Sequence, residues 1–141
     1  MIQIRACTPA DAEAVSGLLK QLGYRLGPGP AAERIRQLGE TGADAIFLVI
    51  ADGGALGVVA THRCRMVQYD KPVVRVTALV VDSRARRRGI GKQLMRHAEA
   101  VAAATGCEFI ELTSAADRAD AHAFYRAIGL RFRKSLAGPG Q

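Results

Sequence analysis

The sequence predicts a single α/β domain over residues 1–141, with helices flanking a mixed, mostly antiparallel sheet in the order β-α-α-β-β-β-α-β-α-β. Three observations support this prediction. The 141 residues correspond to one domain of common size. Apolar residues alternate with period two in some segments and recur with helical period in others. A strong hairpin signal, Asp52-Gly53-Gly54, joins two apolar segments near the middle of the chain.

The first 40 residues predict one strand and two helices. Residues 2–6 alternate between apolar and polar side chains, as in a strand. Residues 8–11, Thr-Pro-Ala-Asp, are typical of a helix start, because the threonine can cap the helix and the aspartate can return a hydrogen bond. Residues 27–30, Gly-Pro-Gly-Pro, predict a loop, and a short helix follows through Ile35 and Leu38.

The rest of the chain predicts five strands and two helices, each recognised from its periodicity and the turn residues beside it. In chain order they are strands over 45–51, 55–65 and 72–81, a helix from Ile90 to Gly106, a strand over 109–112, a helix from about Asp117 to Gly129, and a strand over 130–136.

Positive charge is concentrated in two segments. The chain has 20 Lys and Arg residues against 13 Asp and Glu residues, a net charge of +7. Residues 84–96 hold six bases and no acid, and residues 121–141 hold four bases and no acid. This distribution favours a local anion site over a generally basic nucleic-acid-binding surface.

Several other classes of protein are disfavoured. The apolar stretches are too short for a membrane span of about 20 residues, and no secretory leader pattern opens the sequence. Cys7, Cys64 and Cys107 are odd in number and lack a CxxC spacing, which favours reduced thiols in a cytoplasmic protein. The three histidines do not form a ligand cluster, so we expect no metal site.

The most informative segment is residues 79–92, in which an apolar strand runs through an arginine- and glycine-rich turn into a helix. Glycines let the backbone approach a ligand closely, and the first N–H groups of a helix are free to bind an anion. The segment therefore predicts a phosphate or pyrophosphate site. It lacks the P-loop pattern and the third glycine of the dinucleotide fingerprint, which disfavours ATP, GTP and NAD.

Two motifs, residues 86–91 and residues 120–130, resemble those of the GNAT family of N-acetyltransferases. Residues 86–91, Arg-Arg-Arg-Gly-Ile-Gly, match the family signature R/Q-x-x-G-x-G/A, and residues 79–81 resemble the end of its fourth strand. Residues 120–130 resemble its second motif, A-x-x-x-Y-x-x-x-G-F. Two motifs in the family's order, separated by a helix and a strand, are more specific than either alone. The resemblance implies a GNAT-like fold and transfer of an acetyl group from acetyl-CoA to an amine.

The resemblance also implies where acetyl-CoA binds. The pantetheine arm is expected along the edge of the fourth strand, the pyrophosphate on the loop that follows, and the acetyl group between splayed fourth and fifth strands. There a backbone N–H near Leu79 would polarise the thioester carbonyl. Arg118 stands where many members have an asparagine that contacts coenzyme A. The expected binding residues are Leu79, Val80, Val81, Arg86, Arg87, Arg88, Gly89, Ile90, Gly91, Lys92 and Arg118.

The resemblance implies that Tyr125 is the general acid that protonates the departing thiolate. A phenol, with a reference pKa of about 10, remains protonated at neutral pH. The alternative is that Phe124 and Tyr125 only pack the last helix on the sheet.

The general base is less well defined. Relatives often place Glu or another polar residue where this chain has Ala78 and Thr113, and neither of these accepts a proton at neutral pH. Glu111 precedes Thr113 by two residues, so it shares the same strand face and is our candidate base. An ordinary sheet-face carboxylate is the alternative for Glu111. Further candidates are His62, His122, Asp44, Asp70 and a water chain.

The acceptor is expected to be a small primary amine, because residues 110–125 are similar to those of aminoalkylphosphonate N-acetyltransferases and other small-amine enzymes. Protein acceptors remain open, as does whether the protein is a monomer or a homodimer. A non-catalytic acyl-CoA sensor is the alternative function, and a nucleic-acid-binding module is disfavoured by the 5% of aromatic residues. The candidate acceptor-lining residues are Gln21, Tyr24, Arg25, His62 and Arg65.

Overall fold

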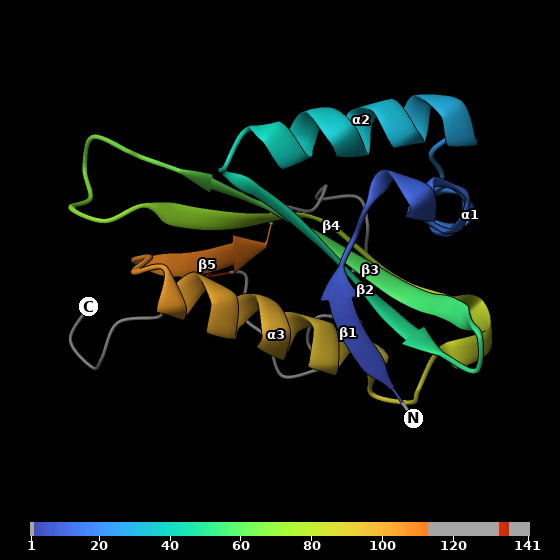
Figure 1. The fold of residues 1–141 in the computed structure, drawn as a ribbon. Helices are drawn as coiled ribbons and strands as arrows, with labels where there is room; N and C mark the ends of the chain where they lie inside the picture. The colour runs from blue at the N-terminus through green and yellow to red at the C-terminus, as the bar shows by residue number, and fades with distance from the viewer. Residues whose placement is uncertain (1, 113–132, 136–141) are drawn as a thin grey trace.

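A computed structural model describes residues 2–112 and 133–135, which form a six-stranded sheet covered by helices on both faces (Figure 1). The strands follow one another across the sheet in chain order. All neighbouring pairs are antiparallel except β4 and β5, which run parallel. The predicted fold class, a mixed and mostly antiparallel sheet flanked by helices, is therefore confirmed. The helix predicted from Asp117 to Gly129 lies outside the described residues.

The described elements follow the predicted order. They are β1 Gln3–Ala6, α1 Ala12–Gln21, α2 Pro28–Glu40, β2 Asp44–Ala51, β3 Gly54–Cys64, β4 Val73–Val81, α3 Ile90–Ala104, β5 Phe109–Leu112 and β6 Arg133–Ser135, with short 3-10 turns at Pro9–Asp11 and Ser83–Ala85. Among the helices that the structure describes, none is long and apolar enough to cross a bilayer.

The predicted loop over residues 27–30 is wrong, because α2 begins at Pro28. Proline has the backbone angle that a first helical turn needs, and its missing N–H would have no helical acceptor there. Gly27 precedes the helix in extended conformation and accepts a hydrogen bond from the Ala31 N–H at 3.0 Å. The two prolines and the glycine between them therefore start a helix.

The local signals at the hairpin and at the first helix are confirmed. Asp52 and Gly53 have φ angles of 53° and 79°, as expected for the turn type whose twist matches a hairpin. The Thr8 N–H donates to the Asp11 carboxylate at 2.8 Å, and Arg5 from β1 donates to the same carboxylate at 2.7 Å. Strand β1 and the first helical turn are therefore joined by one aspartate.

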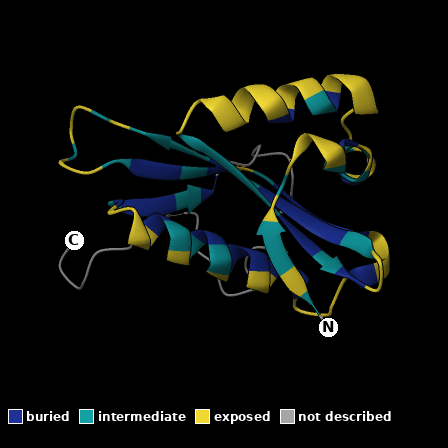
Figure 2. Cartoon of the chain, viewed as in Figure 1, coloured by how far each residue is buried: buried dark blue, intermediate teal, exposed yellow. Residues whose placement is uncertain are grey.

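Two buried layers hold the helices on the sheet (Figure 2). On one face α3 packs through Ile90 and Leu94, and it approaches β3 so closely that a Cβ on Gly57 would lie 3.0 Å from Leu94 Cδ1. On the other face α1 and α2 bury a smaller set of side chains, which includes Leu18 and Ile35. The sheet thus presents one face to α3 and the other to α1 and α2.

A buried carboxylate ties the loop after β4 to helix α1. Asp82 Oδ1 accepts from the Arg84 N–H at 2.8 Å and from Arg84 Nε at 3.0 Å. Gln21, the last residue of α1, donates from Nε2 to Asp82 Oδ2 at 3.3 Å and accepts from the Ser83 N–H at 2.9 Å. These bonds fix the start of the arginine-rich loop.

The hydrogen bonds from the Arg84 side chain and from its N–H lower the pKa of Asp82 from 3.8 to about 2. We expect Asp82→Ala to lower the free energy of unfolding by about 1 kcal/mol at pH 6, as for loss of a helix cap. Because the folded-state pKa lies below that of the unfolded chain, this stabilisation is complete above pH 3.8 and is lost as the pH falls toward 2. Denaturant titrations of parent and variant at several pH values measure this difference.

Asp70→Ala is the matched control, since Asp70 is exposed and its backbone carbonyl rather than its side chain accepts from Arg65. A difference between parent and Asp82→Ala that stays constant down to pH 2 would show that the carboxylate charge does not fix the loop.

Candidate functional site

Among the described residues, strand β4 pairs with β5 only along its first half. This parallel ladder runs through Val74, Arg75 and Val76, and Val76 lies opposite Leu112, the last residue described in β5. Just beyond it Thr77 is an extra residue opposite β3, because Ala60 pairs with Ala78 and Thr61 pairs with Val76. In the part of the chain that the structure describes, residues 78–81 pair with β3 alone.

The open edge of β4 presents backbone groups of Leu79 and Val81. The Asp82 N–H donates to the Leu56 carbonyl of β3 at 2.8 Å. In an antiparallel pair the backbone groups of alternate residues point to opposite sides. The N–H and C=O groups of Leu79 and Val81 consequently point away from β3, along the edge predicted to bind an extended ligand.

The loop between β4 and α3 has the backbone shape of an anion site. Arg87 and Gly89 both have left-handed conformations, with φ angles of 69° and 76°. Helix α3 begins at Ile90, and its first hydrogen bond joins the Gln93 N–H to the Gly89 carbonyl at 3.1 Å. The N–H groups of residues 90–92 have no acceptor within such a helix, and the helix dipole adds positive potential at the same point.

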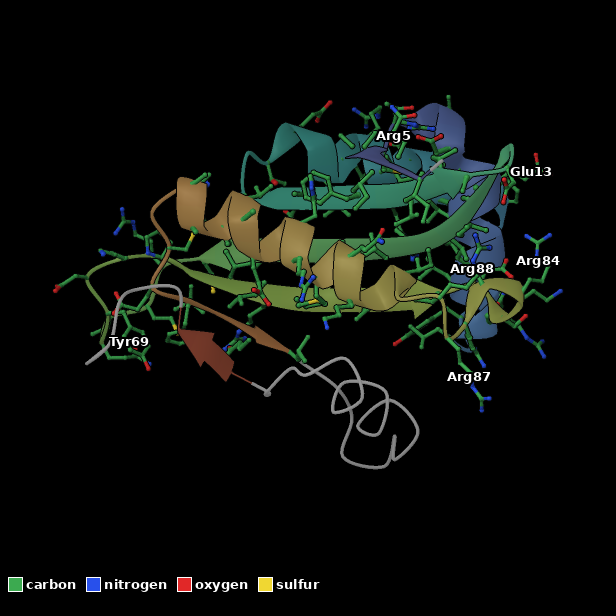
Figure 3. The ribbon with its side chains drawn as sticks, turned by 90° about the horizontal axis from the view of Figure 1, so that it is seen from below. Arg5, Glu13, Tyr69, Arg84, Arg87 and Arg88 are labelled. Carbon is green, nitrogen blue, oxygen red and sulfur yellow. The ribbon has the colours of Figure 1, made fainter. Side chains whose placement is uncertain are left out.

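Space and charge around the loop also suit an anion. A Cβ on Gly89 would meet no protein atom within 4 Å, so the space beside this residue is open. In Figure 3, Arg84, Arg87 and Arg88 surround the loop, and Arg87 points away from the rest of the chain. Arg84, which was not a predicted binding residue, is bound to Asp82. The predicted cations are exposed: Arg86, Arg87, Arg88 and Lys92.

The structure describes most of the predicted site residues but not all of them. Leu79, Val81 and Gly89 lie together along the open edge and the loop, with buried Val80, Ile90 and Gly91 supporting them. Tyr125 and Arg118 lie outside the described residues. Sequence reasoning missed Asp82, whose only local signal is its place before a Ser-Arg-Ala turn, a position that favours capping.

Glu111, the predicted base, is bound to a cation. Its Oε1 accepts from Arg75 Nε at 2.7 Å, and the two residues are register partners on β5 and β4. The Glu111 side chain is only 14% exposed. This geometry favours the alternative of a structural carboxylate on the sheet face. The role of Glu111 as a base stays a prediction.

The predicted acceptor-lining residues are scattered. Tyr24 and Arg25 are exposed after α1, whereas Gln21 is engaged with the loop after β4 and so has a structural partner. Arg65 lines a surface pocket of about 460 Å³ at the C-terminal end of α3, away from the arginine-rich loop. His62 lies on the face of the sheet that α1 and α2 cover, with its Nδ1 3.0 Å from Asp44 Oδ1.

Comparisons with known proteins agree with the geometry. Residues 17–130 match the model of the acetyltransferase (GNAT) family. An aminoalkylphosphonate N-acetyltransferase of Salmonella typhimurium is 32% identical over 94 residues, which cover 63% of this chain and 61% of that protein. The alignment therefore spans about three fifths of the curated relative.

Solved structures show the same fold. The aminoglycoside N-acetyltransferase AAC(6')-Iy, solved in complex with CoA, is 21% identical, covers 100% of this chain and 95% of its own, and has a TM-score of 0.82. A GNAT acetyltransferase of Staphylococcus aureus is also 21% identical, covers 84% of this chain and 90% of its own, and has a TM-score of 0.76. The chain belongs to the GNAT family of acetyltransferases, whose cosubstrate is acetyl-CoA.

Proposed function

We propose that this protein transfers the acetyl group of acetyl-CoA to the primary amine of a small molecule. The observation that carries this proposal is that the edge of β4 facing away from β3 leads directly into the loop at the start of α3. An extended chain that ends in a pyrophosphate can pair with the edge and place its phosphates on the loop. Acetyl-CoA has this shape and charge.

The residues along this path have distinct parts in binding. The backbone groups of Leu79 and Val81 pair with the pantetheine amides, and the N–H groups of residues 90–92 bind the pyrophosphate. The cations that neutralise its charge are Arg86, Arg87, Arg88 and Lys92. The Leu79 N–H donates to the thioester carbonyl, which stabilises the negative charge that develops there during attack.

The proposed acceptor is a small amine. The curated relative is an aminoalkylphosphonate N-acetyltransferase, and aminoglycoside acetyltransferases are among the structural neighbours. Both names describe transfer of an acetyl group to the amine of a small molecule.

Replacing Gly89 with leucine should weaken acetyl-CoA binding at least tenfold, because the side chain would fill the open space beside the loop. Gly106→Leu is the matched control. Gly106 has the same φ of 76° and no atom within 4 Å of its Cβ position, but it lies at the other end of α3. Both variants therefore carry the same backbone strain. Isothermal titration calorimetry with acetyl-CoA measures the difference.

Equal weakening in both leucine variants would attribute the loss to backbone strain. Parent-like binding in Gly89→Leu would show that the pyrophosphate does not bind at this loop.

We further propose that Tyr125 protonates the departing coenzyme A thiolate. Tyr125→Phe should lower kcat at least tenfold while the affinity for acetyl-CoA stays within about twofold, since only the hydroxyl is lost and general acid catalysis typically contributes about 10²–10⁴-fold. Release of free thiol on a panel of small primary amines, aminoalkylphosphonates, polyamines, amino acids and peptides supplies the assay. Tyr69→Phe is the control, because Tyr69 packs edge-on against Phe109 at 5.1 Å.

Parent-like turnover of Tyr125→Phe would show that Tyr125 is not the general acid, and would support the alternative that it only packs. A parent protein that binds acetyl-CoA and acetylates no amine on the panel would support the alternative function of an acyl-CoA sensor.

A further inference from the structure

A histidine and an aspartate meet on the sheet face that α1 and α2 cover. Asp44 on β2 and His62 on β3 are register partners, and Asp44 Oδ1 lies 3.0 Å from His62 Nδ1. The other carboxylate oxygen of Asp44 accepts from Thr41 Oγ1 at 2.7 Å. Both oxygens are therefore engaged, and the aspartate cannot rotate without breaking a bond.

The pair combines a fixed carboxylate with an accessible imidazole. The Asp44 side chain is 13% exposed, whereas that of His62 is 44% exposed. When Nδ1–H donates to Asp44, Nε2 carries the lone pair. Among the described residues we find no hydrogen-bond partner for Nε2. An imidazole oriented in this way is the usual arrangement of a general base.

The strand register places His62 on β3 close to the second half of β4. Val58, Ala60 and His62 alternate along β3, and Val58 packs against α1 and α2, so all three share that face. Ala60 pairs with Ala78, the first residue of β4 after the bulge. His62 lies two residues from Ala60, a distance of about 7 Å along the strand.

The side chains between His62 and the edge of β4 are small and half-buried. Ala60 and Ala78 place only methyl groups on this face. A ligand that runs along β4 from the loop past Val81 and Leu79 brings its far end to the bulge at Thr77. An amine that attacks this end can approach over the two alanines, within reach of His62 directly or through one water.

The charged groups near His62 leave it as the available base. Besides Asp44 on β2, its register partner on β4 is Arg75, and Arg75 in turn binds Glu111 on β5. Arg75 cannot accept a proton, and the Glu111 carboxylate is engaged with Arg75 Nε at 2.7 Å.

We propose that His62 is the general base of the acetyl transfer and that Asp44 is its positioning residue. This inference rests on the proposed N-acetyltransferase function. The amine nitrogen forms a bond to the thioester carbonyl carbon, the C–S bond breaks, and its electron pair leaves on sulfur. The proton lost by the amine goes to His62 Nε2, and the thiolate takes its proton from the general acid.

The test compares His62→Gln and His62→Ala with the parent in the thiol-release assay on the amine panel. We expect kcat to fall at least tenfold in both variants, with acetyl-CoA affinity by calorimetry within about twofold of the parent. Imidazole added to the buffer should restore part of the rate of His62→Ala, and it should not change the rate of the parent. His97→Gln is the control, because His97 lies on α3 at the opposite face, 4.5 Å from the Phe47 ring.

Asp44→Asn tests the positioning role. We expect kcat of this variant to fall severalfold while KM for acetyl-CoA stays constant. A merely structural defect would instead raise KM or lower the melting temperature.

The outcomes separate the inference from the proposed function. An active parent whose His62→Gln variant keeps more than half of the parent kcat overturns the assignment of His62 alone. Loss of activity in His62→Ala without rescue by imidazole, together with weakened acetyl-CoA binding, assigns His62 a structural role and also overturns it. A parent that acetylates no amine overturns the proposed function, and the base assignment with it.

Discussion

The extra residue at Thr77 shifts the register of β4 just before the edge on which we propose that acetyl-CoA binds. Before it, Val74 and Val76 of β4 face α3, and after it Leu79 and Val81 face α3 instead, so the core remains continuous while the strand changes register. The described ladder with β5 reaches Val76, directly before the bulge. A bulge bends its strand and changes the register, so residues 78–81 are set apart from the first half of β4. This second half is the edge on which we propose that acetyl-CoA binds.

The loop that follows this edge depends on a contact that is distant in sequence. Gln21 from α1 reaches Asp82 and Ser83, 61 and 62 residues away, so a helix on one face of the sheet holds the start of the arginine-rich loop. Asp82 is 7% exposed and binds Arg84, whereas Arg86, Arg87 and Arg88 further along the loop are exposed. Helix α1 and the arginine-rich loop are thus joined through one buried carboxylate.

Local sequence patterns predicted most of the described elements. The features that they missed depend on contacts between residues far apart in the sequence. The Asp52-Gly53 turn and the apolar period of α3 are local, and both are confirmed. The prolines after Gly27 were misassigned because proline favours both loops and first helical turns. The bulge at Thr77 has no recognisable signal in the sequence of β4. Likewise, the partners of Asp44 and Glu111 are 18 and 36 residues away, and only the strand register reveals them.

The register across β2 to β5 also supports the proposed base on β3 in a chain that has alanine at position 78. Asp44, His62, Arg75 and Glu111 occupy successive register positions across four strands, and their side chains form two pairs, His62 with Asp44 and Arg75 with Glu111. The second pair neutralises two charges close to the sheet, which leaves the imidazole as the group able to exchange a proton. Because a thioester is already activated, the protein mainly needs to position the amine and remove its proton. The proposed base, a histidine one strand away from this edge, removes that proton without placing a carboxylate beside the developing negative charge.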